Sequence, residues 1–322
     1  MNINTVYLRE QGSVIKKSGG RLQVVSGDEK LANLPARFLK RILIFGNVQI
    51  STQAVAMLLD NGTDVSYLTT RSRLRGMLVG SASKNIYVRI AQHQCWQDPH
   101  FRIQFAREVV EGKIYNMLEM VRYYRRLRKE IDVSQVKDAL TRSLESAQDM
   151  QSTGELLGVE GSATAKYFKI FSLMIDDRFK FPGRRKRPAP DPVNALLSLG
   201  YAMITNELTS LLQAHSLDPY LGFLHGIKYG RPSLALDMVE YYRQPLVDRF
   251  TLSLLNRQIF KERDFYQHPE GGIFLKPDAF KEYLKRYERH FTERKKGEMS
   301  WQGKMQSRIR ELEKRLLAQK AR

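Results

Sequence analysis

Residues 225–240 read HGIKYGRPSLALDMVE and bring a histidine and two carboxylates to the start of a helix. Glycine and proline precede Ser233, a good N-cap for a helix that begins at Leu234. Asp237 and Glu240 are three residues apart, so both lie on one face of that helix. Two like charges at this spacing repel mildly. The stretch therefore predicts a helix whose acidic face is either an exposed cap or the neighbour of a bound cation.

The helical pattern of this stretch extends over most of the chain beyond residue 81. Apolar residues recur at helical spacing, and proline or glycine interrupts the pattern between helices. Pro245 lies inside one expected helix and should kink or split it. The expected helices cover residues 84–97, 100–129, 134–149, 153–175, 192–215, 234–260 and 278–292.

The first 82 residues have a different pattern, that of short strands separated by glycine-containing turns. One short helix is expected over residues 52–59. The fold class is therefore α+β: a small N-terminal β-sandwich-like domain, residues 1–82, followed by a larger all-α catalytic domain, residues 83–322. The expected strands lie near residues 3–8, 13–16, 21–25, 42–45, 48–50, 65–68 and 77–79.

The charge balance indicates an anionic partner. The chain has 53 Lys and Arg against 34 Asp and Glu, a net charge of +19, which favours nucleic acid or an anionic membrane surface. No apolar run approaches the ~20 residues of a membrane-spanning helix, and the N-terminus lacks a signal-peptide pattern. The single cysteine, Cys95, excludes an intrachain disulfide and a Cys-based zinc site. We therefore expect a soluble intracellular protein.

Two basic clusters are candidates for contact with nucleic acid. Residues 178–187 hold six cations interleaved with two phenylalanines, and a Pro-Gly step there predicts a projecting loop. The second cluster, RYYRRLRK from Arg122, ends a helix, where cations either complement the helix dipole or contact DNA. The cations of the loop are Arg178, Lys180, Arg184, Arg185, Lys186 and Arg187.

The C-terminal segment also allows two interpretations. Residues 281–322 are strongly basic, and Met305, Ile309, Leu312 and Leu316 recur at the spacing of one helical stripe. Such a helix packs on its own domain or a partner, or it serves as a DNA-contacting tail.

Glu160 lies beside a face made only of small residues, Gly154, Gly158, Gly161 and Ala165. Each glycine costs a helix interior ~1 kcal/mol relative to alanine. The face therefore predicts close approach by another backbone or by a ligand. Glu160 is then either a solvated neighbour of that contact or a carboxylate that binds the ligand.

Glu160, His225, Asp237 and Glu240 form a set that suits a hard divalent cation. Carboxylates favour Mg²⁺ or Mn²⁺, and an imidazole favours Mn²⁺. Such an ion neutralises phosphate and aids the attacking or leaving oxygen in phosphoryl transfer. The chain contains no GxxxxGK[ST], GxGxxG, GxSxG or HExxH motif, so ATP hydrolysis and cofactor-dependent redox chemistry lack support. Tyr201 is better explained by packing or substrate positioning than as a DNA nucleophile.

Three stretches and the β-then-α layout resemble the Cas-one family, the larger protein of the CRISPR spacer-acquisition complex. The stretches are GVEGSATAKYF (158–168), RRKRPAPDPVNALLSLGYAMI (184–204) and LGFLHGIKYGRPSLALDMVE (221–240). The resemblance implies a homodimer in the cytoplasm of a prokaryote, with residues 1–82 as the dimerisation domain. It also implies a small partner protein (Cas-two) and no membrane partner.

The resemblance implies an integrase and metal-dependent endonuclease that acts on double-stranded DNA. Its reaction joins 3′-OH ends of short foreign DNA, the protospacer, into the CRISPR repeat array by transesterification. The metal ligands carry over to Glu160, His225 and Glu240, while Asp237 matches an auxiliary acidic position. Tyr201 matches a tyrosine near the scissile DNA. Two rival hypotheses are a structure-selective DNA nuclease and a non-enzymatic basic DNA-binding scaffold.

Overall fold

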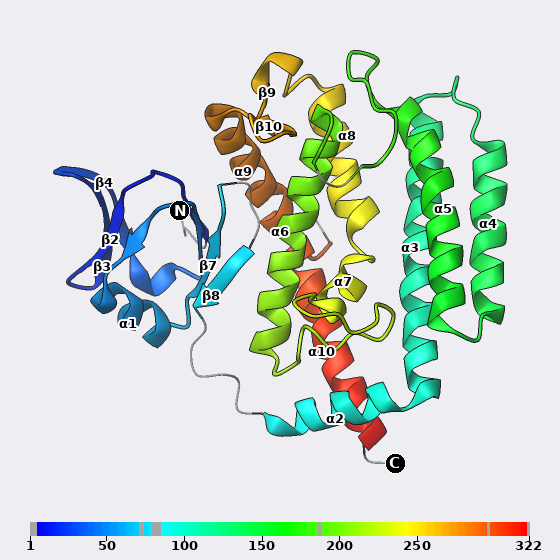
Figure 1. Ribbon diagram of the computed structural model, residues 1–322, viewed down its shortest axis with the longest axis horizontal. Coiled ribbons are helices and arrows are strands. Elements are labelled where there is room, and N and C mark those ends of the chain that lie inside the picture. Colours follow the sequence, from blue (N-terminus) through cyan, green and yellow to red (C-terminus); the bar gives the residue numbers. More distant parts are fainter. Residues whose placement is uncertain (1–4, 71–73, 79–84, 186–187, 295–296, 321–322) are drawn as a thin grey trace. The chain divides into compact units, whose positions relative to one another are not determined.

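The computed structural model describes residues 5–70, 74–78, 85–185, 188–294 and 297–320. The chain divides into two compact units, Met1–Lys84 and Asn85–Arg322. The first is rich in strands and the second is mostly helical (Figure 1), so the predicted α+β class is confirmed. Among the described residues, no helix combines the length and the apolar character needed to cross a membrane.

The described residues of the N-terminal unit form two four-stranded sheets and one α-helix. One sheet has the order β1-β5-β7-β8 and the other β4-β3-β2-β6. Ile15 and Leu22 of one sheet, Ile44 and Val65 of the other, and Leu58 of the helix belong to one buried core. The elements are β1 (Thr5–Leu8), β2 (Val14–Ser18), β3 (Arg21–Ser26), β4 (Glu29–Pro35), a 3₁₀ turn η1 (Ala36–Phe38), β5 (Arg41–Phe45), β6 (Gln49–Ile50), α1 (Thr52–Asp60), β7 (Asp64–Leu68) and β8 (Leu74–Leu78).

The C-terminal unit contains the long helices. Three of them, α3, α4 and α5, lie side by side (Figure 1), and α6 packs against α7 and α10. The elements are α2 (Ile86–Gln97), α3 (Pro99–Leu127), α4 (Ser134–Asp149), α5 (Thr153–Met174), α6 (Pro192–Ala214), α7 (Ser233–Val239), a π-helical turn η2 (Arg243–Asp248), α8 (Arg249–Asn256), a 3₁₀ turn η3 (Glu262–Asp264), β9 (Phe265–Gln267), β10 (Ile273–Leu275), α9 (Pro277–Thr292) and α10 (Trp301–Lys320).

Helix caps explain why the long helices begin where they do. Asp98 and Asp191 accept hydrogen bonds from backbone N–H groups of α3 and α6, and each helix begins with proline. Ser152 and Glu155 form a capping box at the start of α5. These starts set the register of the helices that carry the candidate site.

The sequence did not predict three of the described strands, β4, β9 and β10. The β4 strand is mostly exposed and lacks the alternation of apolar and polar residues that marks a strand. The hairpin of β9 and β10, with three residues in each strand, adds a small sheet to the unit predicted as all-α. Parts of the strands predicted near residues 3–8 and 77–79, and the first residue of the helix predicted over 84–97, lie outside the described residues.

The predicted break at Pro245 is confirmed. Helix α7 ends at Val239, the π-helical turn η2 contains the proline, and α8 starts at Arg249. Proline has no N–H for a helical hydrogen bond, and π turns of this kind are frequent at functional sites.

The basic C-terminal helix α10 packs on its own unit. Met305, Ile309, Leu312 and Leu316 are all buried, and the helix lies against α2, α6 and α9. Cys95 of α2 is buried as well. The interpretation of this segment as a docked helix is therefore confirmed.

The small-residue face of α5 does not touch another backbone. A Cβ atom at Gly158 or Gly161 would meet no atom within 4 Å among the described residues. Gly161 and Ala165 are exposed. The alternative of tight helix–helix packing at this face is therefore wrong, because the face beside Glu160 is open.

We expect Gly158→Ala and Gly161→Ala each to raise the free energy of unfolding by ~0.5–1 kcal/mol, because alanine is the better helix former and meets open space. The matched control is Gly112→Ala in α3, where a Cβ would lie 2.6 Å from Cε1 of Tyr241. This clash should lower the free energy of unfolding by ~1–3 kcal/mol. Urea unfolding measures all three. Loss of stability in the two α5 variants would contradict an open face.

Candidate functional site

A row of alternating charges, buried at Lys113 and Glu240 and partly buried at its two ends, joins α3, α5, the end of α7 and the turn η2. The Lys113 ammonium of α3 contacts the carboxylates of Glu160 in α5 and Glu240 at the end of α7, with 2.6 Å between Nζ and Oε2 of Glu240. The Arg243 Nε atom donates to the same Glu240 oxygen at 2.8 Å. Glu160 also accepts from the Thr164 hydroxyl at 2.8 Å. Two acidic and two basic side chains thus balance each other, and we call these four residues the charge row.

Glu240 is ionised although it is buried. Burial acts to raise the pKa of its carboxyl, but Arg243 and Lys113 outweigh burial and hold that pKa well below its usual range. Burial likewise acts to lower the pKa of Arg243, and Glu240 raises it above its ordinary value. The site therefore keeps a negative carboxylate at a place where a cation is required.

Local packing brings Lys113 to the two carboxylates. The preceding residue, Gly112, has no side chain, and Tyr241 occupies the space that a Cβ would fill. The Asn116 side chain, one turn further along α3, donates to the Tyr241 carbonyl at 2.9 Å. Helix α3 thus lies close against the residue that follows Glu240.

Asp237 orients His225. Its carboxylate is fully buried and accepts from the backbone N–H groups of Phe223, Leu224 and His225 at 2.7, 3.0 and 2.9 Å. It also contacts Nδ1 of His225 at 2.7 Å. These contacts occupy Asp237 and leave Nε2 as the ring nitrogen of His225 that can bind a ligand. Asp237 and Glu240 therefore have different partners.

A glycine permits this arrangement. A Cβ at Gly222 would lie 2.7 Å from the Ser233 backbone carbon and 2.9 Å from Oδ2 of Asp237. Ser233 is the first residue of α7, and its hydroxyl donates to the Gly226 carbonyl at 3.0 Å. The prediction that Ser233 caps the helix is wrong, because the loop carbonyl takes its hydroxyl.

Tyr201 belongs to a buried network beside the charge row. Its hydroxyl contacts Asp248, which also accepts from Tyr167 at 2.9 Å. The guanidinium groups of Arg243 and Arg184 lie 4.6 and 5.3 Å from the centre of its ring. Burial raises the pKa of Asp248 to about 6, while the tyrosine hydroxyls and the arginines act in the opposite direction. Tyr201, predicted as a DNA contact, is thus buried, and its ring packs against the guanidinium group of Arg243.

The donor types suit a divalent ion, but no complete ligand cluster is present. Among the described residues, no group of three or more His, Cys, Asp or Glu side chains is placed to hold a metal. Glu160 and Glu240 meet on Lys113, whereas His225 meets Asp237. Two carboxylates around one cationic group fit Mg²⁺ or Mn²⁺, and a carboxylate on the second nitrogen of a histidine is typical of metal-binding histidines.

A family model described as "CRISPR associated protein Cas1" matches residues 6–289. This chain belongs to the Cas1 family. The resemblance predicted from the sequence is thereby confirmed. A Thermus thermophilus relative, named CRISPR-associated endonuclease Cas1 3, is 35% identical over 294 residues, which cover 91% of this chain and 86% of the relative.

Solved structures have the same fold as this chain. A casposase bound to integration product has a TM-score of 0.86 at 23% identity, covering 98% of this chain and 91% of that chain. The Cas6-RT-Cas1--Cas2 complex has a TM-score of 0.85 at 24% identity, covering 98% of this chain and 35% of that chain. At these identities the likeness establishes the fold alone.

The predicted basic loop is folded against α6 over its described part. Phe179 and Phe181 are buried. The Asn194 side chain accepts from the backbone N–H of Arg185 at 2.8 Å and from Nη1 of Arg184 at 2.7 Å. Arg178 is exposed and pairs with Asp176. The described part therefore does not project as predicted, because its aromatic side chains are buried. Lys186 and Arg187 lie outside the described residues.

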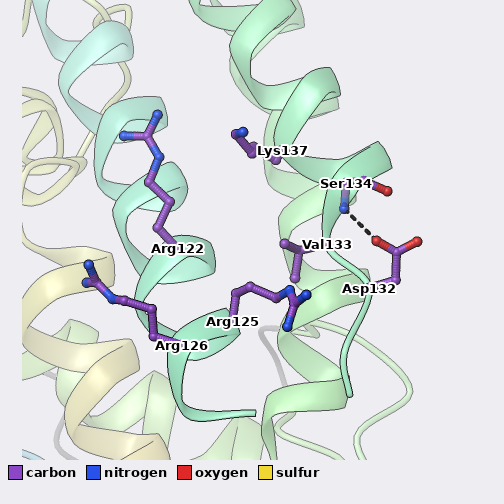
Figure 2. Close-up of a pocket in the computed structure, with 7 residues that line it drawn as sticks. All are labelled: Arg122, Arg125, Arg126, Asp132, Val133, Ser134 and Lys137. Carbon is purple, nitrogen blue, oxygen red and sulfur yellow. Dashed lines mark hydrogen bonds between the residues drawn. The ribbon is translucent and has the colours of Figure 1, made fainter. Parts of the chain in front are cut away.

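The second basic cluster lines an open pocket of about 540 Å³ where α3 ends and α4 begins. In Figure 2, Arg125 and Lys137 point from the two helices toward the space between them. The acidic residue of the lining, Asp132, accepts from the Ser134 N–H at 3.0 Å, and this bond lowers its pKa. The lining residues, here called the basic pocket, are Arg122, Arg125, Arg126, Asp132, Val133, Ser134 and Lys137.

Three further residues of the site, Lys113, Arg243 and Asp248, were not predicted from the sequence. Arg243 could have been found, because it follows Glu240 at the i, i+3 spacing of a helical ion pair. Asp248 lies in the turn that Pro245 predicts. Lys113 gives no local signal, since its partners are distant in the sequence and only the packing of α3 brings them together.

Proposed function

We propose that this protein is a DNA integrase that depends on a divalent metal and joins 3′-OH ends of short foreign DNA into a CRISPR repeat array. The supporting observation is the convergence of Glu160 and Glu240 on one cationic position in the interior. Two carboxylates that meet at one cationic position can also hold a divalent ion, and open positions on that ion can accept a phosphodiester.

Glu160, Glu240 and Nε2 of His225 would hold the ion, Mg²⁺ or Mn²⁺. When bound, it would supply charge neutralisation at the phosphate and activation of the attacking oxygen. The protein groups have separate tasks. Asp237 fixes the ring of His225, and Arg243 keeps Glu240 ionised. The open glycine face of α5 leaves room for the DNA backbone beside Glu160.

The net charge of +19 and the names of the similar proteins support the remaining proposals. One structure of the same fold is bound to an integration product, and another is a complex that includes Cas2. We infer double-stranded DNA as substrate, a small Cas-two partner and a homodimer in a prokaryotic cytoplasm. In this proposal residues 1–82 mediate dimerisation, and residues 83–322 bind metal and DNA.

A second candidate function is hydrolysis of DNA without joining. The relative from Thermus thermophilus is named an endonuclease, and water and a 3′ hydroxyl attack phosphorus in the same way. Incubation with 3′-OH DNA and a supercoiled repeat plasmid separates the two functions, because only an integrase yields joined strands.

We expect Glu160→Gln and Glu240→Gln each to reduce metal-dependent strand transfer and cleavage at least about a hundredfold, because the ion loses a charged ligand. The control is Glu155→Gln on the same helix α5, an exposed residue of the capping box, where glutamine preserves the cap. Gel assays with Mn²⁺ and with EDTA measure the effect. Unchanged activity in both variants, or activity in EDTA, would contradict a catalytic metal site at these carboxylates. DNA binding with no activity in the wild type would favour the scaffold hypothesis.

We propose that the basic pocket contacts DNA phosphates away from the carboxylates. Arg126→Gln together with Lys137→Gln should weaken binding of all DNA sequences and should reduce the slope of log Kd against log salt by roughly 1–2. The control is Arg286→Gln, a comparably exposed arginine in α9 that pairs with Glu282. If the control reduces the slope of log Kd against log salt as much as the double variant does, the basic pocket is not a specific DNA contact.

A further inference from the structure

Lys113 is an unusual lysine. It is 4% exposed, and its ammonium touches two carboxylates from two other helical segments, Glu160 and Glu240. Lysine is almost never fully buried unless it is paired. The position between two carboxylates is also the position that the proposed function gives to a divalent ion.

Neighbouring residues fix the position of Lys113. Gly112 and Asn116 fix α3 against Tyr241, so the lysine enters from a helix held in close contact. The Thr164 hydroxyl donates to the Glu160 oxygen that also faces the ammonium. Arg243 balances the remaining charge of Glu240. The charge row is thus neutral without a metal ion, and its carboxylates already have partners.

We propose that Lys113 is the resident cation of this site, a positioning residue that holds Glu160 and Glu240 together and that a divalent ion must displace from between them. The inference rests on the proposed function, which makes these carboxylates metal ligands. Its physical basis is competition, because an ammonium and a divalent ion repel each other at contact distance and need the same oxygens. Lys113 therefore weakens metal binding and preserves the geometry of the metal-free site.

A purely structural lysine and a resident cation give different results on substitution. Removing either kind leaves buried carboxylates uncompensated and lowers the stability of the metal-free protein. Only removal of a resident cation also tightens metal binding. Metal affinity is therefore the informative measurement.

The test is a Mn²⁺ titration followed by the electron paramagnetic resonance of free Mn²⁺. Lys113→Met should bind Mn²⁺ at least about tenfold more tightly than the wild type, because the competing charge is gone. Lys113→Arg keeps the charge and should not bind more tightly. Lys169→Met, on the exposed surface of α5, is the control for the loss of a lysine. Folded Lys113→Met protein with unchanged or weaker affinity would overturn the proposal.

Two further measurements complete the test. If Lys113→Met does not fold, acetylation of wild-type lysines followed by mass spectrometry decides, since saturating Mn²⁺ should increase labelling of Lys113 and leave Lys169 unchanged. Labelling of Lys113 that does not respond to Mn²⁺ would overturn the proposal. Glu160→Gln separates the two claims. If Glu160→Gln binds Mn²⁺ as tightly as the wild type, the proposed metal site is wrong. If Glu160→Gln weakens Mn²⁺ binding but Lys113→Met does not tighten it, only the proposal of a resident cation is wrong.

Discussion

The contact of one lysine with two carboxylates joins three helical segments of the C-terminal unit. Lys113, Glu160 and Glu240 come from α3, α5 and the end of α7, and Arg243 completes their charge balance. Loss of one partner from a buried ion pair typically costs about 3–5 kcal/mol, since the remaining charge is uncompensated. The helices must therefore approach at these points, and the glycine at position 112 makes that approach possible.

Two acidic residues on the short helix α7 have opposite tasks. Asp237 faces the preceding loop, where three backbone N–H groups and the ring of His225 use its oxygens. Glu240 directly follows the last residue of the helix and belongs to the charge row. The break at Pro245 then places Arg243 and Asp248 on a π-helical turn, so that Arg243 lies between Glu240 and the ring of Tyr201. The irregular backbone thereby connects the two buried polar networks.

Features with a local signal could be predicted from the sequence, and features that depend on packing could not. The long helices, the break at Pro245 and the docked α10 follow from periodicity, proline and an apolar stripe. The pairing of Asp237 with His225 depends on a loop closing over Gly222, and Lys113 depends on the approach of α3. The glycines of α5 suggested a crowded face, yet glycine spacing does not reveal what lies opposite. Phe181 of the basic loop packs on Phe168 and Phe171 of α5, and Asn194 ties the loop to α6.

The central hypothesis is that Glu160, Glu240 and His225 hold a divalent ion at the place of the Lys113 ammonium. The most direct measurement is anomalous diffraction from crystals of the protein soaked in Mn²⁺. The account predicts one strong peak bonded to both glutamates and to Nε2 of His225, with the lysine displaced from between the carboxylates. A crystal in which Mn²⁺ binds elsewhere, while Lys113 still touches both carboxylates, would contradict it.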